Sequence, residues 1–401
     1  MANTTTGFID GSENNVDLGT KYVTKDYFLD IWPSLNTSNT GVNFGAFVQS
    51  WGDNASGELG TRLNIFAKRS SPVNLYTNPV LVPRQVSAGT ISALVTSDGR
   101  LWTWGANEYG ELGQVTTLNR SSPVQVASTI PWKKVASGAN RTYAIGGTSL
   151  NLYGWGFNDT GLVGSNTTLH RSSPTLIQST VSFKDVTSGD SAGSALSTDG
   201  LLYTWGTNSS GSLGLNDTIN RSSPTLVSST TFYKKLMDGG YQGPVFAIAS
   251  NGSLMAIGGQ NTYGDIGDST TLYRSSPVLI TTANNWSQVS GSCGIRSDGT
   301  LWTWGRNTYG RLGDNSTISR SSPIQIGSST DWKFVFSDGV NSTVALKNNG
   351  SLWAWGINSY GQLGLGTIID RSSPVQIGTD KNWISAAIST GHTLAIYSNE
   401  I

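Results

Sequence analysis

Arginine is the most regularly placed of the residues in this chain that could do chemistry. It begins the tetrapeptide RSSP seven times, at Arg69, Arg120, Arg171, Arg221, Arg274, Arg320 and Arg371. A guanidinium has five donors and binds carboxylates or phosphates, so a ring of arginines facing a polyanion is one interpretation. The other is a structural joint, in which the arginine satisfies loop carbonyls and the serines bond neighbouring backbone. We favour the joint, because 25 basic and 25 acidic side chains leave the chain neutral.

The residues that nucleophilic or metal chemistry requires are scarce. Nucleophilic catalysis needs a serine or cysteine beside a positioned base, and the chain has two histidines. His170 precedes the arginine of its RSSP copy, where other copies hold varied residues, so we expect a loop residue. We expect His392 to bond backbone. Two histidines and the single Cys293 do not supply a zinc site of three or four ligands. The sequence therefore predicts no catalytic residues, no metal and no cofactor.

The composition limits the class of protein. Glycine accounts for 49 of 401 residues and charged residues for 12%, which indicates many tight turns and neutral polar loops. A net charge of zero gives no field for nucleic acid. No apolar run reaches the length of about eighteen residues that a membrane span needs. The first residues lack the basic and apolar regions of a secretion signal.

A repeated unit organises the chain. Its consensus is WGxNxxGxLG, as in WGANEYGELG at 104–113 and WGRNTYGRLG at 304–313. An asparagine fills the fourth position of every copy, where it tolerates left-handed backbone and caps its own turn. Ile257 replaces the tryptophan in one copy; the other six begin at Trp51, Trp104, Trp155, Trp205, Trp304 and Trp355.

Short alternating apolar stretches surround each unit. Asp-Gly or Asn-Gly pairs such as 98–99 precede the tryptophan strand and predict hairpins with type I′ turns. Four such strands in each repeat of about fifty residues predict an all-β, seven-bladed β-propeller. The first copy starts at its tryptophan strand, whereas 382–398 contains two strands and no tryptophan strand. These fragments should pair as one closing blade, which removes open sheet edges.

These boundaries divide the chain into two parts. Residues 43–401 form the predicted propeller, whose closing blade joins 43–78 with 382–401, and residues 1–42 form an N-terminal arm. Within the propeller, Asp185, Asp190, Asp238 and Asp338 lie near the ends of the predicted innermost strands. They could ring the mouth of the central channel as acid pairs, but we favour solvated or turn-capping roles.

The units, the RSSP tetrapeptides and GHTLAI at 391–396 resemble the regulator of chromosome condensation repeat family over roughly residues 43–401. The resemblance implies a seven-bladed propeller. In the founding member of that family, a wedge-like insertion and an acidic residue promote nucleotide exchange on a small GTPase, and a basic extension helps to hold chromatin. The repeats here are nearly uniform and the arm is not basic, so a guanine nucleotide exchange factor is the weaker alternative. Another relative, secreted by bacteria, inhibits β-lactamases.

The arm carries a second resemblance. Residues 14–35 look like the leader of propellers of this family that marine tailed bacteriophages encode, where they are virion-associated. The resemblance implies a virion protein of head, neck or tail, whose propeller binds a host surface protein or a glycan. The arm would dock on the propeller or on another virion protein through Tyr22, Tyr27, Phe28, Ile31 and Trp32. The alternative is a stand-alone interaction or inhibitor protein.

Binding residues are expected where the copies differ. The turns after the innermost strands and the long loops that contain the asparagines should share one face of a propeller. The tyrosines that recur in four copies could instead be packing residues. The candidate contacts on this face are Arg141, Tyr241, Arg306, Arg311, Tyr109, Tyr263, Tyr309 and Tyr360.

Overall fold

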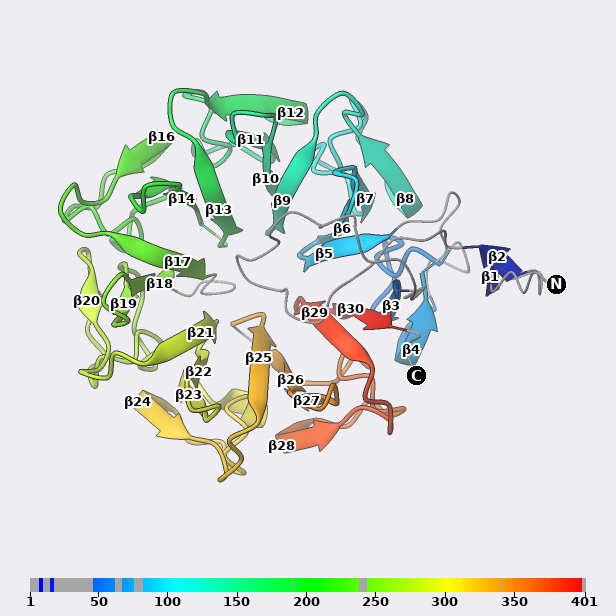
Figure 1. Cartoon of the computed structure of the whole chain (residues 1–401). Helices are drawn as coiled ribbons and strands as arrows, with labels where there is room; N and C mark the ends of the chain where they lie inside the picture. The colour runs from blue at the N-terminus through cyan, green and yellow to red at the C-terminus, as the bar shows by residue number, and fades with distance from the viewer. Residues whose placement is uncertain are drawn as a thin grey trace, which may run out of the picture.

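The protein is a seven-bladed β-propeller. The computed structural model describes residues 7–9, 15–17, 46–61, 67–75, 82–189, 191–237, 244–339 and 341–398. Seven four-stranded antiparallel sheets are arranged radially around a central axis (Figure 1). An additional antiparallel pair consists of β1 (Gly7–Ile9) and β2 (Asn15–Asp17). The helical content of the described residues is the short 3-10 turn η1 (Thr308–Gly310). The predicted fold class is therefore confirmed.

We number the blades around the ring and give the strands of each from the axis outward. Blade 1 contains β29 (Trp383–Ile388), β30 (His392–Ser398), β3 (Ala46–Gly52) and β4 (Arg69–Asn74). Blade 2 contains β5 (Pro83–Ala88), β6 (Ile91–Thr96), β7 (Leu101–Gly105) and β8 (Arg120–Val126). Blade 3 contains β9 (Trp132–Ser137), β10 (Arg141–Gly146), β11 (Asn151–Gly156) and β12 (Arg171–Gln178).

The remaining blades follow the same order. Blade 4 contains β13 (Phe183–Ser188), β14 (Ala192–Ser197), β15 (Leu202–Gly206) and β16 (Arg221–Leu226). Blade 5 contains β17 (Tyr233–Met237), β18 (Phe246–Ala249), β19 (Leu254–Ala256) and β20 (Val278–Leu279). Blade 6 contains β21 (Trp286–Ser290), β22 (Cys293–Arg296), β23 (Leu301–Gly305) and β24 (Arg320–Gln325). Blade 7 contains β25 (Trp332–Ser337), β26 (Ser342–Lys347), β27 (Leu352–Gly356) and β28 (Arg371–Gln376).

Blade 1 closes the ring as predicted. β3 pairs with β30 without interruption, from Ala46 opposite Ser398 to Gly52 opposite His392. The C-terminal strands β29 and β30 therefore lie beside the N-terminal strands β3 and β4 (Figure 1). Because the two ends of the propeller complete one sheet, strands that would otherwise end in open edges are paired.

The hairpin turns differ from the predicted type I′. Gly99, Gly200, Gly299 and Gly350 have positive φ, but the aspartate or asparagine before each does not. The N–H of Gly99 bonds the carbonyl of Thr96, and the N–H of Thr96 bonds the carbonyl of Arg100. This pattern is a type I turn followed by a left-handed glycine, the usual three-residue hairpin. The prediction of the hairpins was right and that of the turn type was wrong.

The core lies between blades rather than within them. One cluster joins Leu101 and Val126 of blade 2 to Trp132 and Trp155 of blade 3, and none of these four side chains is exposed. The other clusters likewise combine residues of neighbouring blades, as for Trp51 with residues of blade 7. Each blade therefore buries its faces only against its neighbours.

The tryptophans of the repeat fasten each blade to the preceding one. The indole Nε1–H of Trp155 in blade 3 donates to the carbonyl of Glu111 in blade 2 at 2.8 Å, and the hydroxyl of Thr142 donates to the same oxygen. All six repeat tryptophans are fully buried. The equivalent bonds run from Trp51 to Gln362, Trp104 to Glu58, Trp205 to Leu162, Trp304 to Asp265 and Trp355 to Arg311.

The repeated asparagines hold the long loops in shape. Asn158 accepts the N–H of Val163 through Oδ1 and donates from Nδ2 to the carbonyls of Thr167 and Leu169. Its side chain is fully buried. The structural role is confirmed. Equivalent Oδ1 bonds are made by Asn54, Asn107, Asn208, Asn261, Asn307 and Asn358.

RSSP forms a bulge in the outermost strand. Arg171 pairs with Gly156 and Thr175 pairs with Gly154, so three residues of β12 lie opposite Trp155 alone. Five other blades show the same register shift. RSSP thus opens the outermost strand of the blade. Its proline needs no donor because it lies in the bulge.

The bulge is the second joint between blades. The carbonyl of Ser172 in blade 3 accepts the N–H of Val115 from the loop of blade 2 at 2.7 Å. A side chain on Gly110 of that loop would place its Cβ 2.4 Å from the Cα of Ser172. The equivalent backbone bonds run from Asn166 to Ser222, Asn216 to Ser275, Ser269 to Ser321, Asn315 to Ser372 and Gly366 to Ser70. RSSP is thus a structural joint, but the serine carbonyl makes it, rather than the arginine and the serine hydroxyls as we expected.

Blade 5 has the shortest strands, because its repeat departs from the consensus. Ile257 occupies the tryptophan position and is fully buried, but it has no indole N–H to donate to blade 4. Gly259 and Arg274 form only an isolated bridge, outside the two-residue strand β20. The weakest copy in sequence is thus the least regular blade.

The close approach of the loop glycine to the next blade predicts a large cost for Gly110→Ala. At φ +84 the new methyl group is strained, and it meets the backbone of Ser172. The matched control is Gly327→Ala, because Gly327 has φ +62 and nothing within 4 Å of an added Cβ. The control should cost about 1 kcal/mol and Gly110→Ala about 2–4 kcal/mol, measured by chemical denaturation. If both substitutions lowered the free energy of unfolding equally, the close contact between Gly110 and the RSSP bulge would be contradicted.

Candidate functional site

The candidate site is the face that carries two sets of loops. The long loops between the third and fourth strands of a blade contact the turns between its first and second strands. The N–H of Phe157 bonds the carbonyl of Asn140, and the N–H of Ile357 bonds that of Asn341. The two sets therefore share one face, as predicted from the sequence.

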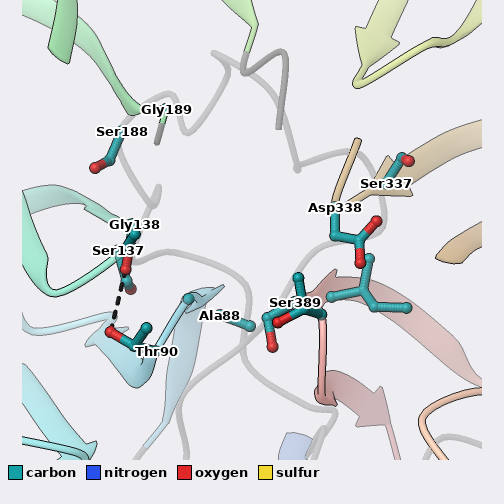
Figure 2. A pocket seen from close by; sticks show the side chains of 13 residues that line it. Ala88, Thr90, Ser137, Gly138, Ser188, Gly189, Ser337, Asp338 and Ser389 are labelled. Atoms are coloured by element: carbon teal, nitrogen blue, oxygen red, sulfur yellow. Dashed lines mark hydrogen bonds between the residues drawn. The ribbon is translucent and has the colours of Figure 1, made fainter. Parts of the chain in front are cut away.

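A cavity of about 360 Å³ lies where the inner turns converge on the axis. It is lined by residues at the ends of β5, β9, β13, β25 and β29 and in the turns that follow (Figure 2). Most lining side chains are small and carry hydroxyls, such as Thr90, Ser137, Ser188 and Ser389. The hydroxyls of Ser137 and Ser188 are buried without a hydrogen-bond partner among the described residues. Asp338 is the charged residue of the lining.

The acids near the axis do not form a catalytic pair. Asp338 accepts the N–H groups of Asn341 and Ser342, so it caps its turn. Asp185 is 4% exposed and forms a 2.5 Å ion pair with Lys134 of the neighbouring blade. Asp338 thus has the favoured turn-capping role, whereas Asp185 is neither solvated nor a turn cap but the partner in a buried ion pair between blades. Asp190 and Asp238 lie outside the described residues.

Both histidines are engaged in structure. The Nδ1 of His170 accepts the backbone N–H of Asn158, so this loop residue caps the start of its own loop. His392 is buried, and its ring nitrogens contact the hydroxyls of Ser92 in blade 2 at 2.8 Å and Ser389 at 3.0 Å. His392 thus bonds hydroxyls rather than the backbone that we expected. Burial lowers the pKa of His392 to about 4.

Cys293 is buried next to the hydroxyl of Thr343, with its sulfur 3.6 Å away. Burial raises the pKa of its thiol to about 12, which keeps it protonated and unreactive at neutral pH. Within the described ranges, no group of three or more His, Cys, Asp or Glu residues is placed to hold a metal ion. The same residues contain no helix long and apolar enough to cross a membrane.

Two of the predicted contact residues are buried. Arg141 is 1% exposed and donates to the carbonyls of Ala139 and Gly189. Arg311 is 8% exposed and donates from Nε to the carbonyl of Arg306, and burial lowers its pKa to about 10. Their guanidinium groups support the inner turns and the loop of blade 6. They therefore do not belong to the exposed surface.

The remaining contact candidates lie on the loop face. Arg306 is half-buried and stacks on Tyr263 of the preceding blade, 4.8 Å from the ring centre. Tyr360 lies under Lys68 of blade 1, and Tyr109 packs edge-on against Phe157 of blade 3. The tyrosines thus help to join blades, yet Tyr263, Tyr309 and Tyr360 are 45%, 52% and 39% exposed. Tyr241 and the five residues of the proposed anchor lie outside the described residues.

The sequence analysis missed a series of exposed aliphatic side chains. Six blades carry one at the position two residues before the arginine of RSSP, and all six are 58–64% exposed. The signal was an apolar residue at a fixed place in an otherwise polar loop. These residues are Leu118, Leu169, Ile219, Leu272, Ile318 and Ile369.

The sequence profile of the RCC1-like domain family matches residues 47–395, which is most of the chain. The chain belongs to this family. The ultraviolet-B receptor UVR8 of Arabidopsis thaliana is 28% identical over 332 residues, which cover 78% of this chain and 75% of UVR8. The human E3 ubiquitin-protein ligase HERC2 is 34% identical over 139 residues, 33% of this chain. The match spans only 3% of the length of HERC2.

Solved structures share the fold of this RCC1-like chain. Human WBSCR16 superposes with a TM-score of 0.77 at 18% identity, over 89% of this chain and 100% of that one. Prp20p from Saccharomyces cerevisiae superposes with a TM-score of 0.75 at 18% identity, over 88% of this chain and 91% of Prp20p. Family and fold together agree with the seven-bladed propeller described above.

The low pKa of His392 predicts that acid destabilises the ring closure. The unfolded chain takes up a proton near pH 6.5, whereas the folded protein does so only near pH 4. Stability should therefore fall as the pH drops from about 6.5 to about 4, by up to about 3 kcal/mol. His392→Gln should lose this dependence, measured as urea midpoints at pH about 7.5 and about 5. Equal acid sensitivity of variant and parent would contradict the assignment.

Proposed function

We propose that this chain is a non-enzymatic binding protein, and that its loop face holds a partner protein or glycan as part of a bacteriophage virion. One observation carries the binding role. The repeated tryptophans, asparagines and RSSP serines are bonded inside the ring, whereas other loop residues such as Tyr263, Tyr309 and Tyr360 remain exposed on the loop face. A surface that is rigid in its backbone and variable in its side chains suits recognition.

The exposed side chains favour a protein over a glycan as the main partner. Tyr263 and Tyr309 offer large amphipathic surfaces, and aliphatic residues such as Leu272 and Ile318 lie in the same loops. Aromatic anchors with apolar neighbours are typical of protein interfaces. Family relatives support this choice, because the solved structure of Prp20p is described with its binding to Gsp1p and histones, and a second structure shows it bound to Kap60.

The place in a virion rests on the N-terminal sequence. The stretch from Tyr22 to Trp32 carries more apolar side chains than a free linker needs, and it resembles the leaders of phage-encoded propellers. We propose that this arm anchors the chain to another virion protein and that the loop face points toward a host surface protein or glycan. Neither nucleic acid nor a membrane span is part of the proposal.

Mass spectrometry and cryo-electron microscopy of phage particles purified from the source of this gene test the proposal. We expect a seven-bladed ring on the particle, with residues 20–35 against a neighbouring protein. Absence of the chain from intact particles would contradict the virion role.

The loop face has a separate test on the same particles. Tyr263→Ser combined with Tyr309→Ser should leave the ring on the particle and weaken attachment to the host by about tenfold or more. The control is Tyr273→Ser, because Tyr273 is also about half exposed but its hydroxyl is bonded to Thr262. Unchanged attachment in the double variant would exclude this part of the face.

A further inference from the structure

The seven RSSP arginines are not equivalent. In blade 5, Nε of Arg274 donates to Asp268 at 2.7 Å, and in blade 6 Arg320 donates to Asp314 at 3.1 Å from its terminal nitrogen. In blade 4, Arg221 forms a 2.6 Å ion pair with Asp217. In these three blades a carboxylate of the same loop neutralises the guanidinium.

Blades 5 and 6 show how a carboxylate is held there. Besides the arginine, Asp268 accepts the N–H and hydroxyl of Thr270, with its hydroxyl at 2.6 Å, and the amide of Asn261. Its side chain is 3% exposed. Burial by itself would raise the pKa of Asp268, but the bonds from Thr270 and Arg274 lower it. An arginine, a hydroxyl and a buried asparagine thus form a receptor for one carboxylate.

Blades 2 and 7 have the same donors but no aspartate in that position. Gln114 and Leu365 occupy the places that Asp268 and Asp314 hold in blades 5 and 6. The Nε of Arg120 and the hydroxyl of Thr116 are buried without a hydrogen-bond partner among the described residues. The same is true of Arg371 and Thr367 in blade 7. These are the groups that bind the carboxylate in blade 5.

Blades 3 and 1 also carry an RSSP arginine without an aspartate in the position that Asp268 holds in blade 5. The Nε of Arg171 is also buried without a partner in the described part of the chain, and Ser165 occupies the aspartate position. Arg69 of blade 1 is exposed. Blades 7, 1, 2 and 3 follow one another around the ring. The loop of blade 7 is bonded to blade 1 through Gly366 and Ser70, and the loop of blade 2 is bonded to blade 3 through Val115 and Ser172. We call Arg371, Arg69, Arg120 and Arg171 the basic arc.

The basic arc is accompanied by apolar side chains. Leu118 of blade 2, Leu169 of blade 3 and Ile369 of blade 7 are 63%, 63% and 58% exposed, each two residues before an arginine of the arc. A partner that satisfies both features carries carboxylates spaced among aliphatic groups. That combination is found in acidic segments of proteins and not in a nucleic acid backbone.

We propose that the basic arc binds an acidic segment of a partner protein, whose Asp or Glu carboxylates bond the arginines of blades 2, 3 and 7 and the hydroxyls of blades 2 and 7. The internal aspartates of blades 5 and 6 show the geometry that the incoming carboxylates adopt. This inference rests on the proposed function and names the chemistry of the partner.

Fluorescence anisotropy with the full chain tests the proposal. The probe is a labelled peptide of several Glu-Leu-Asp-Gly repeats, and its control has Gln and Asn in place of the acids. We expect saturable binding of the acidic peptide that weakens as salt is added, because the contacts are charged and partly exposed. The control peptide should bind at least about tenfold more weakly. Failure of the acidic peptide to bind the parent chain would overturn the proposal.

Matched variants assign the binding to the arc. Arg120→Gln with Arg171→Gln should weaken peptide binding by about tenfold or more. Arg221→Gln with Arg274→Gln removes the same charge from arginines that already have aspartate partners, so binding should stay within about twofold. Equal weakening by both pairs would mean a general charge effect and would overturn the assignment.

Variants that add an aspartate to the loops of the basic arc distinguish a specific loss of peptide binding from a loss of folding. Gln114→Asp with Ser165→Asp places acids where blades 5 and 6 have them, so the peptide should bind about tenfold more weakly while the thermal midpoint stays the same or rises. Unchanged binding would overturn the proposal, as would single-stranded DNA binding the parent chain as tightly as the peptide. If the chain is absent from particles but binds the peptide, only the virion role fails. If the chain is present in particles but does not bind the peptide, only the proposal for the basic arc is refuted.

Discussion

The structure depends on one contact made again and again around the ring. Between most neighbouring blades, the long loop of one is bonded to the next at two points, the indole of a tryptophan and the carbonyl of the first RSSP serine, as between blades 2 and 3. Loops normally lie on the surface with few tertiary bonds. Here the loop is the fastening between blades, and this requires glycine where the backbones touch, asparagine to fold the loop, and a bulge to bring the serine forward.

This fastening explains why the repeat is conserved along the chain while the surface is free to vary. The tryptophans and asparagines of the consensus have internal partners, as Trp155 and Asn158 do, so these side chains are not available for chemistry. The positions between them differ from blade to blade and determine the properties of the loop face. The arginines show the consequence, since an identical tetrapeptide is neutralised by Asp268 in blade 5 and lacks a carboxylate in blade 2. A structural repeat can therefore carry an asymmetric binding surface.

Much of the fold was predictable because it follows from the number of repeats and of strands in each repeat. Seven repeat units, four strands per unit and two half-blades at the ends determine a closed propeller, and the structure confirms it. Local geometry was harder. The hairpin turn depends on which residue takes positive φ, and the bulge depends on pairing with a distant strand. Arg141 and Arg311 looked exposed because they are charged and lie next to variable loops, but carbonyls of neighbouring turns bind them. The missing aspartates of blades 2, 3 and 7 were visible in the sequence, but their meaning required the contacts of Asp268.

The most direct test of this account is the hydrogen exchange of loop amides in the full chain. Val115, Asn166, Asn216, Ser269 and Asn315 lie in exposed loops, and Val115 is 77% exposed, yet their N–H groups bond serine carbonyls of the next blade. If these bonds fasten the ring, the amides should exchange as slowly as those of the central strands, by opening of the whole structure. Exchange as fast as that of ordinary loop amides would show that the blades are held together without them.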